Sequence, residues 1–146
     1  MHKVTFTLHA RRLIQDELHK FPLVETGGVL LGYVTDEGIY VKETICGGDN
    51  AVRKPGMFQY DISYVEQKSN RVASNYKPPL VLVGIWHKHN HTLEPAFSQA
   101  DYEMHNKLLK QNEKGVSCLF QMRGDGRYQL KILDSQNNIY KGSYLW

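Results

Sequence analysis

The chain has 146 residues, of which 41% are hydrophobic and 23% are charged. These fractions are typical of a folded, soluble domain and argue against a disordered tail protein or a collagen-like repeat. The formal net charge is only +3 and the basic residues are scattered, so we expect no nucleic-acid partner. Two cysteines can form at most one disulfide, which excludes a cysteine-rich scaffold.

The sequence contains no apolar run that could cross a membrane. The longest uncharged apolar stretch, Leu80 to Trp86, is far shorter than the roughly 18–20 residues of a membrane span. The first residues also lack the pattern of a signal peptide. We therefore expect no membrane partner, a cytoplasmic location and one domain over residues 1–146, while the oligomeric state stays open.

The first part of the chain predicts a strand, a helix and a second strand. Residues 3–8 alternate between apolar and polar side chains, which is typical of a strand. Apolar residues then recur at helical spacing between residues 13 and 21, and Pro22 ends this pattern. The nearly continuous apolar run of residues 27–34 indicates a buried strand.

The next part predicts a strand, a loop and a helix. A turn at residues 36–38 leads into a strand over residues 39–45. The glycines and the proline within residues 47–57 predict an irregular, exposed loop. A helix follows from Asp61, whose side chain can cap the first turn, and its apolar residues share one face as far as Val72.

The last part completes a mixed fold. Residues 80–86 are apolar and rich in β-branched and aromatic side chains, which predicts a central strand. A helix over about residues 98–110 and strands over residues 116–122, 128–133 and 139–140 follow. The sequence thus predicts an α/β fold of the mixed α+β kind, with a central mixed β-sheet flanked by helices.

Histidines gather directly after the predicted central strand, at His87, His89 and His91, and Asp101 follows on the next helix. Side chains two apart on an extended strand end point to the same side, so His87 and His89 can face one point and Asp101 can add an oxygen. Two nitrogens and one oxygen suit zinc, which in catalytic sites commonly keeps a position for water. We therefore expect one Zn²⁺ per chain.

A zinc-activated water needs a base, and Glu25 is the candidate. It precedes the glycine-rich entry to a buried strand and so should lie near a sheet end. Taken alone, Glu25 also fits an ordinary surface carboxylate. A histidine pair with one residue between its members likewise occurs by chance in many chains.

Simpler interpretations exist for other residues of the site. Ser98 to Asp101 fits the helix-capping pattern, in which Asp101 only satisfies backbone N–H groups. His105 lies one turn beyond Asp101 and suits either packing or support of the site. Cys118 alternates with core residues and is interpreted as an inert buried thiol, whereas the role of Cys46 stays open.

Three segments in this order resemble the JAB/MPN domain of JAMM-type metalloproteases: Glu25–Gly32 (ETGGVLLG), Gly84–His89 (GIWHKH) and Ser98–Asp101 (SQAD). The resemblance covers nearly the whole chain. It implies a single-domain MPN/JAB fold with a layering similar to that of cytidine deaminases. The cysteine signature of zinc deaminases is missing, as are the HExxH and GxSxG patterns of other hydrolases.

The resemblance also implies roles for individual residues. His87, His89 and Asp101 would hold zinc, and Glu25 would act as general base and then as general acid. Ser98 would help to stabilise the oxyanion of the tetrahedral intermediate.

The sequence departs from the family pattern at two points. Asn90 stands where the family usually has proline, and the interval from His87 to Asp101 is one position longer than usual. We choose His87 and His89 as ligands because a tryptophan immediately precedes the first histidine, as in the family, and because a loop accommodates one extra residue. The set of His89, His91 and Asp101 stays an alternative.

Members of this family cut after the diglycine tail of ubiquitin-like or sulfur-carrier proteins. The resemblance therefore implies a zinc peptidase or isopeptidase that removes such a protein from a conjugate or processes its precursor. The compact chain resembles bacterial or phage-type members, and the loop over residues 47–57 is a candidate substrate contact. The alternative is a metal-free scaffold within a larger assembly, although the retained ligands and Glu25 favour an enzyme.

Overall fold

The structure is a computed structural model that describes residues 3–89 and 97–146. Its elements, in chain order, are β1 (Lys3–Phe6), α1 (Leu8–Lys20), β2 (Thr26–Thr35), β3 (Gly38–Cys46), β4 (Val52–Lys54), β5 (Met57–Gln59), α2 (Ile62–Ser74), β6 (Val81–His89), α3 (Gln99–Gln111), β7 (Val116–Met122), β8 (Tyr128–Leu133) and β9 (Ile139–Leu145). No helix within these ranges is long and apolar enough to span a membrane.

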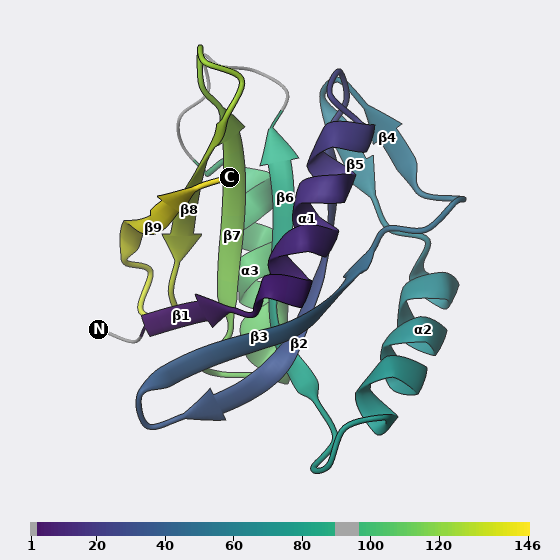
Figure 1. Ribbon diagram of the computed structural model, residues 1–146, viewed down its shortest axis with the longest axis vertical. Coiled ribbons are helices and arrows are strands. Elements are labelled where there is room, and N and C mark those ends of the chain that lie inside the picture. The colour runs from purple at the N-terminus through teal and green to yellow at the C-terminus, as the bar shows by residue number, and fades with distance from the viewer. Residues whose placement is uncertain (1–2, 90–96) are drawn as a thin grey trace.

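A curled mixed sheet forms the centre of the molecule (Figure 1). Its strand order is β1-β3-β2-β6-β7-β8-β9, and β6 pairs antiparallel with β2 but parallel with β7. In the view of Figure 1, α1 crosses in front of the sheet and α3 lies behind it. The structure thus confirms a mixed sheet flanked by helices.

Helix α1 packs on the sheet through one apolar stripe. Ala10, Ile14 and Leu18 are four residues apart and have no exposed surface. Burying a side chain such as Ile or Leu stabilises the fold by roughly 1.5–3 kcal/mol, so this stripe holds the helix in place. The Thr7 side chain caps the helix by accepting a hydrogen bond from the Ala10 N–H at 3.1 Å. The strand predicted over residues 3–8 therefore ends earlier, at Phe6.

The predicted irregular loop over residues 47–57 is wrong in its second half. There, β4 and β5 form an antiparallel hairpin in which Arg53 lies opposite Phe58. Strands of three residues are too short to show periodicity in the sequence. Side-chain contacts of Arg53 with Glu17, Thr26 and Gly48 hold this hairpin in place.

Strand β6 continues beyond its predicted end at Trp86 as far as His89. His87 and Lys88 are paired on both sides, with His87 opposite Gly27 of β2 and Leu119 of β7, whereas His89 is paired only with Gln121 of β7. Polar side chains interrupt the apolar pattern there, but the backbone ladder continues. The two histidines therefore belong to the central strand instead of following it, and His89 is its last residue.

Candidate metal centre

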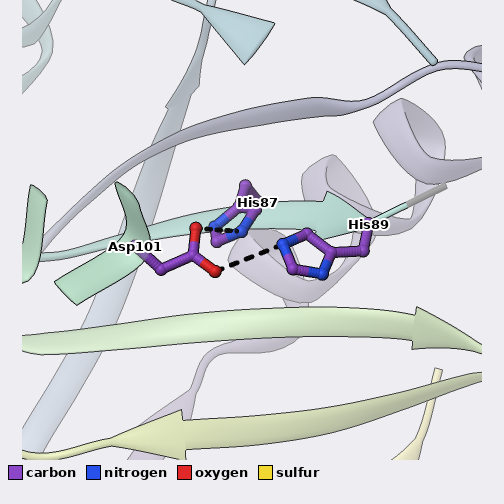
Figure 2. Close-up of side chains that lie close together, drawn as sticks. All are labelled: His87, His89 and Asp101. Carbon is purple, nitrogen blue, oxygen red and sulfur yellow. Dashed lines mark ion pairs between the residues drawn. The ribbon is translucent and has the colours of Figure 1, made fainter. Parts of the chain in front are cut away.

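The residues at the end of β6 alternate between the two faces of the sheet. Trp86 belongs to the core beneath α1, and the Lys88 ammonium donates to the Phe21 carbonyl at the end of that helix. His87 and His89 point to the opposite face, where both imidazoles turn toward the Asp101 carboxylate (Figure 2). The expectation that the two histidines share one side is confirmed.

Asp101 reaches the site from the first turn of α3. The Ser98 hydroxyl accepts a hydrogen bond from the Asp101 N–H at 3.2 Å, and Asp101 Oδ2 accepts one from the Ser98 N–H at 2.7 Å. This reciprocal pair is a capping box, so the capping interpretation of Asp101 is confirmed. It orients the carboxylate, while Oδ1 faces His87. Capping the helix and holding a metal are therefore compatible.

Three possible ligand atoms converge at this point. His87 Nε2 lies 2.9 Å from Asp101 Oδ1, and His89 Nε2 lies 3.2 Å from Asp101 Oδ2. The ligand atoms of the three residues all lie within 4.8 Å of one another. Two ligand atoms on a tetrahedral zinc ion with bonds of 2.0–2.1 Å are about 3.3 Å apart. The group is thus compatible with a metal site.

One further observation fits a cation between these side chains, and the pKa of Asp101 shows that its carboxylate is ionised. Within the described part of the chain, His87 Nε2 is buried and has no hydrogen bond of acceptable geometry, despite its short distance to Asp101. Burial alone would raise the pKa of Asp101, but the contacts with His87 and His89, the charge of His87 and the Ser98 N–H together hold this pKa well below its usual range. Asp101 is therefore an anion, as a metal ligand must be.

A cleft of 780 Å³ opens over the three residues. Residues of the β4–β5 hairpin, of α3 and of the central strands line it, the last including Ile85 of β6 and Ser117 of β7. Glu25 and Ser98 line the same cleft. The structure therefore brings all five residues proposed from the sequence to one cavity.

Glu25 is half-buried and immediately precedes β2. Its backbone N–H donates to the Lys54 carbonyl of the hairpin at 2.9 Å. Gly27, two residues later, lies opposite His87 in the sheet. The charge of Glu25 also reaches Lys88 on the other face: burial lowers the pKa of Lys88 to about 8, and Glu25 opposes this shift. The Glu25 backbone is therefore fixed between the hairpin and the strand that carries the histidines.

The alternative ligand His91, like Asn90, lies outside the described residues. We expect His87→Ala to lose zinc and His91→Ala to retain it, because His87 and His89 already converge on Asp101. Elemental analysis of the purified variants measures this directly. Loss of zinc in His91→Ala alone would reverse the assignment.

His105 forms a buried polar contact that the sequence only partly indicates. The side chain has no exposed surface; its Nδ1 lies 2.7 Å from the Ser117 hydroxyl and its Nε2 lies 2.9 Å from the Asp134 carbonyl. A carbonyl only accepts, so Nε2 carries the proton and Nδ1 accepts from Ser117. His105 therefore connects α3 to β7 at Ser117, which lines the cleft. No local pattern identifies Ser117 as its partner.

This contact makes stability depend on pH. Burial lowers the pKa of His105, although the Asp134 carbonyl opposes the shift. In the unfolded chain its pKa returns to about 6.5, so the unfolded state binds more protons than the folded state below that pH. We expect the free energy of unfolding to fall as pH drops from about 6.5 toward the folded pKa, and His105→Gln to flatten this slope. Urea denaturation at several pH values tests this; an unchanged slope in the variant contradicts it.

The two cysteines do not contribute a nucleophile to the cleft. Cys118 is fully buried, as predicted, and burial raises its pKa to about 12. Burial also raises the pKa of Cys46 to about 12, and the neighbouring Glu17 adds to this effect. Both thiols therefore stay protonated at neutral pH and are poor nucleophiles.

No family model matches the sequence, and no curated protein matches it either. Among solved structures, the chain is similar to the solution structure of protein DSY2949 from Desulfitobacterium hafniense. The two share 15% identity with a TM-score of 0.62, and the match covers 96% of this chain and 90% of that one. At this identity the likeness concerns the fold alone.

Proposed function

We propose that this protein is a zinc-dependent peptidase or isopeptidase with the JAB/MPN fold of JAMM-type metalloproteases. It hydrolyses the amide bond after the diglycine tail of a ubiquitin-like or sulfur-carrier protein. The observation that carries the proposal is the convergence of His87, His89 and Asp101 in a cleft that Glu25 and Ser98 also line. A general base and a hydroxyl beside a His-His-Asp group are the parts that metal-assisted amide hydrolysis requires.

His87, His89 and Asp101 hold the metal through two nitrogens and one oxygen. When bound, zinc polarises the scissile carbonyl and lowers the pKa of water to about 7. Glu25 accepts the proton of the attacking water and returns it to the leaving amine. The Ser98 hydroxyl oxygen accepts a hydrogen bond from the Asp101 N–H. The O–H of Ser98 therefore stays available to donate a hydrogen bond to the developing oxyanion.

A diglycine tail suits this cleft on physical grounds. Glycine has no side chain, so its backbone can approach the base of a cleft closely and adopt conformations that other residues avoid. The bond after the second glycine then lies next to the His-His-Asp group, while the folded body of the substrate stays outside.

The direct test is a panel of diglycine-tailed fusion proteins incubated with the zinc-loaded protein and analysed by intact mass. We expect cleavage after the second glycine that a chelator abolishes and added zinc restores. Fusions with Ala-Ala in place of Gly-Gly serve as matched controls and should stay intact. Absence of both stoichiometric zinc and cleavage would favour the metal-free scaffold.

A further inference from the structure

We infer that Arg53 is a positioning residue that fixes Glu25 and the hairpin side of the cleft. The effect of Arg53 on the rate of hydrolysis rests on the proposed function. Its effect on the order of the Glu25 backbone and the β4–β5 hairpin does not, and it can be measured without metal or substrate.

The Arg53 guanidinium joins three separate segments of the chain. Nε donates to the Thr26 hydroxyl at 3.0 Å, Nη1 donates to the Gly48 carbonyl at 3.0 Å, and Nη2 contacts Glu17 Oε1 at 3.1 Å. The Arg53 side chain is only 12% exposed. The planar guanidinium has several N–H donors in fixed directions and can therefore bond to three segments at once, whereas the ammonium of lysine acts as a single point charge.

The acceptors of Arg53 are themselves connected. The Thr26 hydroxyl donates to Glu17 Oε1 at 2.9 Å, so the same oxygen receives both Thr26 and Arg53. Glu17 is buried in α1 and forms an ion pair with Arg53. Removing Arg53 alone would leave this carboxylate buried without its cation, which is costly.

Aromatic rings complete the junction. The guanidinium carbon of Arg53 lies 4.3 Å from the centre of the Phe21 ring and 6.0 Å from that of Phe58. Phe58 in turn lies against Gly27 and Gly47, where an added Cβ would come within 3.0 Å of its ring. Cation–π contacts and the close approach of Phe58 to these two glycines therefore pack the hairpin against the start of β2 and the end of β3.

Two neighbours of Glu25 belong to this junction. Thr26, the next residue, is held by Arg53 through its hydroxyl. The backbone carbonyl of Lys54, the residue after Arg53, accepts a hydrogen bond from the Glu25 N–H at 2.9 Å. Arg53 itself is not among the described residues that line the cleft, so it acts through Glu25 and the hairpin. A shift of about 1 Å in a reacting group can cost roughly a hundredfold in rate.

Hydrogen exchange on the metal-free protein tests the structural part. We expect Arg53→Met to raise the exchange rate of the Glu25 amide and the paired β4–β5 amides by about tenfold or more, while β6 and β7 keep their protection. The exposed Arg12→Met is the matched control and should change neither. If Arg53→Met does not fold, the double variant Glu17→Gln/Arg53→Met replaces it in this experiment, because it also removes the Glu17 carboxylate that would be buried without its cation. Unchanged protection of the Glu25 amide would overturn the inference.

Kinetics test the catalytic part. We expect Arg53→Met to lower kcat by about a hundredfold with zinc content unchanged, and Arg53→Lys to restore only part of it. In a Glu25→Gln background, Arg53→Met should lower the residual rate little further, because both changes act on one group. An equal loss in both backgrounds would show that Arg53 acts elsewhere. If the wild type hydrolyses nothing, the proposed function fails, while the exchange experiment still decides whether Arg53 positions Glu25.

Discussion

Glu25→Gln should lower hydrolysis by about 10²–10⁴-fold while leaving zinc content and stability near those of the wild type. Glutamine keeps the size of the side chain but cannot accept a proton from water at neutral pH. The Glu25 backbone N–H bond to Lys54 does not involve the side chain and should persist. Metal analysis, urea denaturation and the fusion assay on one preparation measure all three quantities.

Asp16→Asn on α1 is a matched control for Glu25→Gln, because it replaces an exposed carboxylate by the amide of the same size without touching the cleft. Activity of Glu25→Gln at the wild-type level would remove Glu25 from the mechanism. Loss of zinc in that variant would instead indicate that Glu25 is a ligand.

Asp101→Ala should lose both stoichiometric zinc and hydrolysis, because it removes the oxygen ligand that faces His87 and His89. It should also destabilise the fold by about 0.5–2 kcal/mol, because the capping box at the start of α3 is lost with it. Metal analysis and denaturation measure the two effects separately.

Ser98→Ala separates capping from metal binding. It removes the hydroxyl that accepts the Asp101 N–H, so a similar loss of stability is expected, but the zinc ligands stay intact. The rate should fall by about 10²–10³-fold, as for the loss of an oxyanion donor. If Ser98→Ala loses as much zinc as Asp101→Ala, zinc binding depends on the capping box at the start of α3 and the Asp101 carboxylate is not shown to be a ligand.

The sequence predicts the site better than it predicts the surroundings of the site. His87 and His89 share a face because side chains on a strand alternate, and this rule needs no tertiary information. The capping of α3 by Ser98 is likewise local. The meeting of Asp101 with the histidines depends on how α3 packs on the sheet, so spacing only makes it possible and the resemblance to a family adds the reason to expect it.

The features that sequence reasoning missed depend on long-range contacts. The β4–β5 hairpin consists of very short strands, and Arg53 holds it through Glu17, Thr26 and Gly48, which lie up to 36 positions away. His105 and Ser117 meet only because α3 crosses β7. A largely covered arginine among polar partners has no periodic signature, so composition and spacing cannot identify it.

The most direct test of the metal centre is zinc-edge anomalous diffraction from crystals of the zinc-loaded protein. We expect one strong peak per chain at about 2.0–2.2 Å from His87 Nε2, His89 Nε2 and an Asp101 oxygen, on the side of the cleft that Glu25 lines. A peak held by other residues, or none between these three side chains at saturating zinc, would contradict the account.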